Sequence, residues 1–502
     1  MARYALGFDV GSSSIKASLV DVDSRTCVAT VSAPEQEMPI TARRSDWAEQ
    51  DPRMWWRYMV ECTQLLRRQW RLDQVASVGI SYQMHGLVAV DSDGNPLRDA
   101  IIWCDSRAVP YGEQAYTALG GAEAVLPRLL NSPGNFTASK LAWVQEHEPE
   151  LYQQIQYIML PGDWLAYRMT GTAATTMGGL SEGILWDFSR GEPAQIVLDH
   201  FNFDPALIPP VRENIATPEA PHGLVTAEAA EELGIPAGTP VSYRAGDQPN
   251  NALSLNVLQP GEIAATAGTS GVIYGVVDHP VWDRDSRVNT FIHVNHTAAT
   301  PRLGVLQIVN GTGILNRWMR EEITSRDVSY QEMNAIAQGI PVGSDGLSML
   351  PFGNGAERIL SNANPGGSVH GLNFNIHTRA HLLRAAQEGI VFALNRGLGI
   401  MRDMGLTVNT VRAGRGNMFL SPLFQEAFAT VTGATVELYN TDGSEGAARG
   451  GAYGAGLFSS LPEAFSGLAV QERIEPNRAH AAAYQDAYQR WNAILNRTVP
   501  TP

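Results

Sequence analysis

One short pattern occurs twice in this chain, about half a chain apart. It consists of a strand, a turn rich in Gly, Ser and Thr, and a second strand whose apolar residues alternate. The first copy covers residues 4–22 and the second covers residues 261–277. A turn of this kind presents backbone amides and hydroxyls that can meet phosphate oxygens. The repeat therefore predicts two related α/β domains, residues 1–250 and 251–502, each with a phosphate-binding turn.

The length and charge of the chain agree with two domains and limit the ligand classes. At 502 residues the chain is long enough for two or three domains with sizeable cores. Its net charge of −15 argues against nucleic-acid or anionic-membrane partners, which usually need a basic face. An anionic ligand must therefore be met by backbone amides, helix N-termini or a metal ion.

Several familiar enzyme motifs are absent from the sequence. The chain has two lysines, Lys16 and Lys140, and neither follows a glycine, which excludes the GxxxxGK[ST] phosphate loop. The HRD and DFG pair of protein kinases, the GxGxxG dinucleotide turn and the HExxH zinc motif are also missing. The three cysteines form no CxxC, and no apolar run approaches about 18 residues. These observations favour a soluble, cytoplasmic protein.

The hydrophobic pattern predicts the remaining elements. Asp51 followed by Pro52 is typical of a helix start, and the apolar spacing predicts a helix over 51–72. Further strands are expected at 27–33, 75–81 and 86–91, and the segment 110–240 reads as mainly helical. Helices are also predicted at 378–402, at 445–458, where small residues allow close packing, and at 480–497.

Asp9 stands at the end of the first strand, directly before the turn Gly11-Ser12-Ser13-Ser14. A carboxylate there can hold Mg²⁺ while turn amides and hydroxyls meet phosphate oxygens, and Lys16 adds a positive charge nearby. An ordinary Gly/Ser turn with an adjacent aspartate explains the same residues equally well. The matching turn of the second copy, with Gly268 and Thr269, is by itself closer to a plain hairpin.

Two further groups of residues could carry chemistry. Asp247 follows Gly246 and precedes Gln248, so it is either a general base for a hydroxyl or the cap of the following helix. Gln83, Met84 and His85, with Trp103 and Asp105, combine an amide, an imidazole, an indole and a carboxylate, a set that suits a polyol. Taken singly, His85 is better explained as a partly buried histidine with its hydrogen bonds satisfied, and Trp103 as a core aromatic.

In this order along residues 4–460, the motifs resemble those of the FGGY family of carbohydrate kinases. The resemblance rests on seven segments, which are GFDVGSSSIKASLVD, GISYQMHGLVAVD with IIWCDSRA, GDWLAYRMTG, AGDQPNNAL, GEIAATAGTSGVIY, GLNFNIHTRAHLLRAAQEGIVF and AGRGNMFLSPLFQ. Within the family, the second segment is most similar to the branch that phosphorylates D-xylulose.

The resemblance implies a two-domain α/β fold of the actin/Hsp70-like (ribonuclease H-like) ATPase type with a deep interdomain cleft. It also implies transfer of phosphate from ATP to the 5-hydroxyl of D-xylulose, with Mg²⁺ and ATP as cofactors. Its implied site residues are Asp247 as base, Asp9 for the metal, Gln83, Met84, His85, Trp103, Asp105 and Gln248 for the sugar, and Ser12, Ser13, Lys16, Gly268, Thr269, Gly414, Gly416 and Asn417 for ATP.

The sugar is the least determined part of this interpretation. Gln248 stands where D-xylulose kinases commonly have Asn, and the AGRGN loop departs from the usual nucleotide loop. Kinases for ribulose, glycerol or gluconate, a catalytically silent sugar-binding regulator, and a chaperone-like ATPase of the same fold are the alternatives. A homodimer is the base-rate expectation for the oligomeric state.

Overall fold

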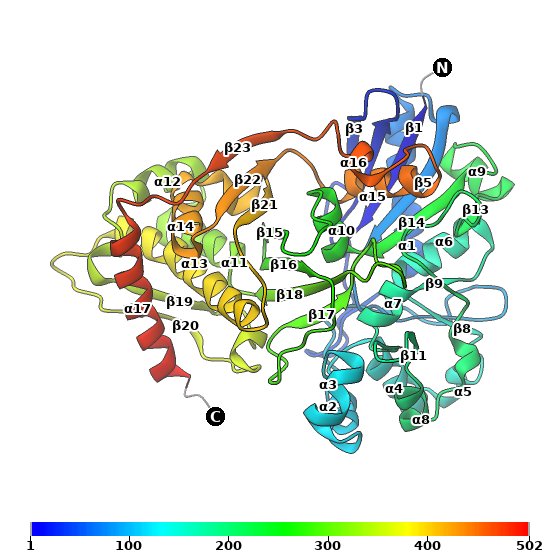
Figure 1. Cartoon of the computed structure of the whole chain (residues 1–502), viewed down its shortest axis with the longest axis horizontal. Helices are drawn as coiled ribbons and strands as arrows, with labels where there is room; N and C mark the ends of the chain where they lie inside the picture. The colour runs from blue at the N-terminus through cyan, green and yellow to red at the C-terminus, as the bar shows by residue number, and fades with distance from the viewer. Residues whose placement is uncertain (1–2, 500–502) are drawn as a thin grey trace.

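The computed structural model describes residues 3–499, which form two β-sheets covered by helices (Figure 1). The first sheet has six strands in the order β13-β14-β5-β1-β2-β3. Their bounds are Gly223–Leu224, Pro240–Gly246, Val75–Tyr82, Tyr4–Val10, Ile15–Asp21 and Thr26–Ala33. The second has seven strands in the order β17-β18-β16-β15-β21-β22-β23. Their bounds are Asn289–Ile292, Leu303–Val309, Gly271–Val277, Ile263–Ala267, Thr410–Gly414, Thr435–Tyr439 and Val470–Ile474.

The two sheets share one topology. In the first, β3, β2 and β1 are antiparallel neighbours, β5 and β14 continue in parallel with β1, and β13 closes the edge antiparallel. In the second, β18, β16 and β15 are antiparallel, β21 and β22 continue in parallel with β15, and β23 closes the edge antiparallel. The repeat predicted from two hairpins therefore extends over six strands of each sheet, and β17 is an addition to the second.

Helices cover both sheets. Around the first sheet lie α1 (Pro52–Arg67), α6 (Pro161–Thr170), α9 (Ala227–Leu233) and α10 (Asp247–Ser254). Around the second lie α11 (Gly313–Trp318), α12 (Tyr330–Gln338), α13 (Arg379–Asp403), α14 (Pro422–Thr432) and α17 (Ala481–Thr498). Helix α1 starts as predicted, because the Asp51 side chain accepts a hydrogen bond from Arg53 N, but it ends at Arg67 rather than at residue 72.

The segment 110–240 is less helical than predicted. It contains α2 (Val109–Ala118), α3 (Gly121–Leu129), α4 (Thr137–His147), α5 (Pro149–Tyr152), α6, α7 (Met177–Glu182), α8 (Gln195–Phe201) and α9. Six strands of two or three residues, β8 to β13, interrupt these helices, at Tyr157–Met159, Thr175–Thr176, Trp186–Asp187, Glu192–Pro193, Val211–Arg212 and Gly223–Leu224. Strands of two or three residues are too short to show a readable alternation of apolar and polar side chains.

Helix α15 (Gly443–Gly454) comes from the second half of the chain but packs on the first sheet, against β1 and β5. Figure 1 shows α15 and α16 (Leu461–Ala464), in orange, among the blue strands of that sheet. The helix lies so close that a Cβ on Gly7 or Gly79 would overlap the carbonyl oxygens of Ser444 and Ala447. The small residues predicted for this helix thus serve packing between distant segments. The division of the chain at residue 250 remains a prediction.

None of the helices within residues 3–499 combines the length and the apolar composition that a bilayer-spanning segment needs.

Candidate active site

A cavity of about 340 Å³ lies between the two sheets, lined by residues from both halves of the chain. Ten of the predicted site residues meet in it, together with six that are not among the predicted site residues. The predicted residues are Asp9, Ser12, Ser13, Lys16, Gln83, Met84, His85, Trp103, Asp247 and Gln248. The others are Gly11, Ser14, Ser270, Val272, Leu306 and Ile308. Residues up to 299 positions apart in sequence, from Asp9 to Ile308, thus line one cavity. Gly11 to Ser14 form the tight turn between β1 and β2, with Gly11 N donating to Ser14 O at 3.1 Å.

Asp9 occupies the end of β1 and faces this cavity. The Ser81 hydroxyl on the neighbouring strand β5 donates to Asp9 Oδ1 at 2.7 Å. Burial raises the pKa of Asp9, the Ser81 hydrogen bond opposes this, and the nearby Asp442 carboxylate raises the pKa further. The carboxylate is therefore held in a fixed position in an environment that would favour a cation beside it.

Asp247 is the first residue of α10, directly after β14. The N-cap position belongs to Gly246, and no side chain caps this helix, so the capping explanation for Asp247 does not apply. Burial, followed by the negative charge of Asp9, raises the pKa of Asp247 from 3.8 to about 7. A carboxyl group that titrates near neutral pH is well matched to accepting a proton from a hydroxyl.

Three uncharged acceptors line the cavity beside Asp247. The side-chain oxygens of Gln83 and Gln248 are buried and have no hydrogen-bond partner. The His85 Nδ1 lies 2.9 Å from the Glu182 carbonyl oxygen. Because a carbonyl only accepts, Nδ1 carries the hydrogen and Nε2 keeps a free lone pair. Burial and the nearby Lys140 charge lower the pKa of His85 to about 3, so the ring is neutral. The cavity therefore offers acceptors to a ligand rich in hydroxyl groups.

Trp103 stands at the mouth of the cavity with 52% of its surface exposed. Its indole Nε1 donates to the Ser12 hydroxyl at 3.4 Å. This hydrogen bond connects residues 83–105, the predicted sugar segment, with the first turn. Val272 on β16 and Leu306 and Ile308 on β18 contribute apolar side chains to the lining. The period-two alternation of these strands could have indicated these apolar side chains, but not what they face.

A second cavity of about 310 Å³ is lined only by residues of the second half of the chain. It includes three of the predicted nucleotide residues, Gly268, Thr269 and Asn417, and ten others. These are Ala267, Gly313, Ile314, Asn316, Arg317, Tyr330, Asn334, Met418, Leu420 and Ser421. Gly414 and Gly416 do not line it.

The turn at 268–270 is held against the start of α11. Gly313 N donates to Gly268 O at 2.9 Å, and Ile314 N donates to Thr269 O at 3.1 Å. A Cβ on Gly313 would overlap the Gly268 carbonyl oxygen, so only glycine fits this approach. Since Ser270 lines the first cavity and Thr269 the second, the turn joins the two.

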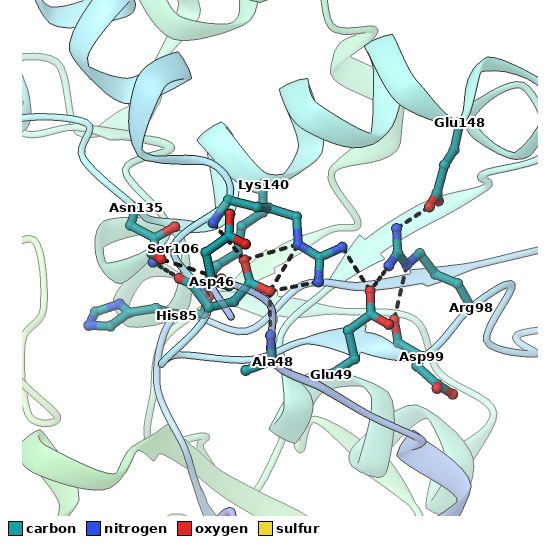
Figure 2. Close-up of polar contacts among 12 residues, drawn as sticks. Asp46, Ala48, Glu49, His85, Arg98, Asp99, Ser106, Asn135, Lys140 and Glu148 are labelled. Atoms are coloured by element: carbon teal, nitrogen blue, oxygen red, sulfur yellow. Dashed lines mark hydrogen bonds and ion pairs between the residues drawn. The ribbon is translucent and has the colours of Figure 1, made fainter. Parts of the chain in front are cut away.

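Asp105 differs from its prediction, because it lies outside the lining of the first cavity. It is completely buried, and its carboxylate accepts from Ala48 N and from Arg107 Nη2, each at 2.6 Å. Arg107 also pairs with Glu49, and the pairing continues through Arg98 to Glu148. Figure 2 shows this network, with Lys140 and His85 at one end and Arg98 and Glu148 at the other. Asp105 thus supports the sugar segment from behind.

Two buried residues near His85 had no sequence signal of their own. Lys140 on α4 donates from Nζ to the His85 carbonyl oxygen at 2.6 Å. Glu182, the last residue of α7, lies beside the His85 amide. Neither belongs to a motif, and only the tertiary structure brings them to the sugar segment.

Comparison with known proteins agrees with this arrangement. The N-terminal domain of the FGGY family of carbohydrate kinases matches residues 4–254, and the C-terminal domain of the same family matches residues 263–457. A xylulose kinase of Haemophilus influenzae is 28% identical, over 98% of this chain and 99% of its own.

Solved structures show the same fold. A xyloylose kinase from Brucella ovis superposes with a TM-score of 0.88 at 24% identity, over 99% of each chain. A gluconate kinase from Lactobacillus acidophilus reaches a TM-score of 0.89 at 24% identity, over 100% of this chain and 99% of that one. The predicted two-domain ATPase fold is therefore confirmed. With both family domains matched in order around the shared cavity, the chain belongs to the FGGY family of carbohydrate kinases.

Proposed function

We propose that this sugar kinase transfers the γ-phosphoryl group of ATP to the 5-hydroxyl of D-xylulose, with Asp247 as the general base. The observation that carries the proposal is the position of Asp247, a buried carboxyl with a pKa of about 7, in the cavity that also holds the first Gly/Ser turn. The full-length similarity to proteins named xylulose kinase supports this choice of sugar.

The charges of the first cavity favour a neutral sugar over an acidic one. Asp9 and Asp247 supply negative charge, while Gln83, His85 and Gln248 are uncharged. Among the described residues of the lining, Lys16 is the only cationic side chain, and it stands on β2 beside the phosphate turn. A carboxylate-bearing sugar such as gluconate would find no cationic partner beside the three acceptors.

ATP is proposed to extend from the first cavity into the second. Ser12 and Ser13 would meet phosphate oxygens from one side, and Gly268 and Thr269 from the other, since the 268–270 turn joins the two cavities. Asn417 lines the second cavity and is the proposed contact for the adenosine side. Gly414 and Gly416 are proposed to shape the loop that carries Asn417.

The residues present fit a Mg²⁺ ion bound together with ATP. No group of three or more His, Cys, Asp or Glu residues within residues 3–499 is arranged to hold a metal alone. Mg²⁺ bound with ATP needs only one or two carboxylates besides phosphate oxygens and water. Asp9 would hold the ion. Its negative charge repels the Asp247 carboxylate and raises the pKa of Asp247, and a cation bound at Asp9 would relieve that repulsion. When bound, Mg²⁺ would neutralise charge on the phosphates.

In this mechanism the sugar hydroxyl hydrogen passes to an Asp247 oxygen as the hydroxyl oxygen bonds to the γ-phosphorus. The bond between that phosphorus and the bridging oxygen breaks, and ADP leaves. Gln83, His85 and Gln248 would orient the sugar by accepting from its other hydroxyls. Closure of the two sheets around the cavity would exclude water, which otherwise competes for the phosphoryl group.

Coupled ADP release with Mg-ATP tests the proposal against D-xylulose, D-ribulose, L-ribulose, L-xylulose, glycerol and gluconate, with a no-sugar control. We expect D-xylulose to be preferred and gluconate to be inactive. Folded Asp247→Ala should lose at least 10³-fold in kcat, while the exposed Asp93→Ala control should keep wild-type turnover. Preference for another sugar would reject D-xylulose alone. Normal turnover of Asp247→Ala would reject the base, and the absence of sugar stimulation would favour a silent regulator or another ATPase.

A further inference from the structure

The backbone of His85 is held in an unfavourable conformation within the sugar segment. Its φ angle is +62°, in the left-handed region that non-glycine residues rarely adopt. The neighbouring residues Gln83 and Met84 continue from β5 into the first cavity. Left-handed backbone at a ligand cavity persists only where surrounding contacts hold it in place.

One of these contacts comes from Lys140. Its Nζ donates to the His85 carbonyl oxygen at 2.6 Å, and the side chain is completely buried on α4 (Figure 2). Burial lowers the pKa of Lys140 to about 7, and the Asp105 carboxylate opposes this. Burying a lysine costs free energy, so its hydrogen bonds inside the protein must compensate. The short hydrogen bond from Lys140 Nζ to the His85 carbonyl oxygen therefore restrains that peptide unit.

The second contact comes from Glu182 on α7. Its Oε1 accepts from the His85 amide at 3.4 Å, and its carbonyl oxygen accepts from His85 Nδ1 at 2.9 Å. Its side chain is 1% exposed and does not line the first cavity. The Glu182 carboxylate packs close to Gly246 and Met84. A Cβ added to Gly246 would overlap Glu182 Oε2 and would lie 2.5 Å from Met84 Cγ.

Two aromatic rings complete the enclosure. The His85 ring meets Phe136 edge-on at a centroid distance of 4.7 Å, and Phe291 lies 5.5 Å away. The His85 ring is thus held by packing against Phe136 and Phe291 and by the contact of its Nδ1 with the Glu182 carbonyl oxygen. The peptide unit is fixed at its amide by Glu182 and at its carbonyl by Lys140.

We propose that Glu182 and Lys140 are a pair of positioning residues that clamp His85 in its left-handed conformation, and that this clamp sets the affinity for the sugar. It acts through His85 and Met84, without touching the substrate itself. The inference rests on the proposed function in its assignment of His85 to the sugar. The clamp itself rests only on the contacts of His85.

The clamp predicts different effects on sugar binding and on phosphoryl transfer from ATP. Loss of a clamp residue should loosen His85 and weaken sugar binding, while ATP and Asp247 keep their places. We expect Lys140→Met and Glu182→Ala to raise the sugar KM at least tenfold, with kcat and the KM for ATP within about threefold of wild type. Glu182→Gln keeps an oxygen acceptor for the His85 amide and should restore most of the sugar affinity.

Hydrogen exchange followed by mass spectrometry gives a readout that requires no sugar. Peptides covering residues 83–87 should exchange at least tenfold faster in Lys140→Met and Glu182→Ala, with β1 and β14 unchanged. Glu388→Ala is the matched control, because Glu388 is also a buried carboxylate, paired with Arg384 on α13 far along the chain. It should leave exchange at 83–87 and the sugar KM unchanged.

Wild-type exchange at 83–87 in folded Lys140→Met and Glu182→Ala, or an unchanged sugar KM in folded Lys140→Met, would overturn the clamp. So would equal loss of kcat in Glu182→Gln and Glu182→Ala, because that result would give Glu182 a role in proton transfer. If the wild-type protein phosphorylates no sugar of the panel, the proposed function fails, while the exchange measurement still decides the clamp.

Discussion

Replacing Asp247 by Asn should stabilise the protein, and the gain should grow with pH. The wild-type carboxyl titrates near 7 in the folded protein and near 3.8 when it is exposed. Below the lower value both states are protonated and the carboxyl costs nothing. As the pH rises, the unfolded state ionises first, so stability is lost progressively until the pH passes about 7. The full cost is about 4 kcal/mol.

Asparagine has nearly the same shape but no proton to lose, so it avoids this cost. The stability gained by Asp247→Asn should be about 2 kcal/mol at pH 5 and about 4 kcal/mol at pH 8. For a unit of 150–250 residues, the difference between the two pH values corresponds to a rise in Tm of roughly 5 °C or more.

Scanning calorimetry in EDTA-containing buffer, from pH 5 to pH 8, measures this gain without a cation that could neutralise the site. Asp93→Asn is the control, since Asp93 is exposed and lies outside the cavity lining. A gain from Asp247→Asn that stays constant or shrinks with rising pH would refute the reasoning, because the Asp247 carboxyl would then not be destabilised by its surroundings.

Three further predictions follow from the site and the packing. Asp9→Asn should raise the Mg²⁺ concentration for half-maximal activity, and unchanged Mg²⁺ dependence would remove Asp9 from the metal site. Gly79→Ala should destabilise the protein by about 1–3 kcal/mol, because its Cβ overlaps the Ala447 carbonyl oxygen, and unchanged thermal melting would contradict the close packing of α15. Trp103→Ala should raise the sugar KM roughly threefold to tenfold while leaving Tm unchanged, since Trp103 is half exposed, and an unaltered KM would show that the indole does not contact the sugar.

Much of the fold follows from local sequence patterns. The two hairpins, the helix at 378–402 and the small-residue helix near 445 all occur where alternation, helical spacing and composition predict them. These elements depend on residues that are neighbours in sequence, so their signals are readable locally. The resemblance to a kinase family also predicted ten of the sixteen residues that line the first cavity.

Two predictions differ from the structure for a different reason. The neighbours of Asp105 in sequence predict a sugar contact, but its carboxylate is bonded to Ala48 N and Arg107, and Arg107 in turn pairs with Glu49. The segment 110–240 is predicted to be mainly helical, but it also contains short strands, of which β9 pairs with β12 and β8 pairs with Val88–Val90. In both cases, contacts between residues far apart in sequence contribute to the difference.

The sequence by itself determined the duplicated strand-turn-strand design, the two turns rich in Gly, Ser and Thr, and which residues are candidates for accepting a proton or a metal, because these depend on residue type and short spacing. Only the tertiary structure decided that α15 returns to the first sheet, that Lys140 and Glu182 enclose His85, and that the pKa of Asp247 is raised to about 7. The physical reason is that burial and the electrostatic interaction between charges are properties of position in space, which distant segments create together when the chain folds.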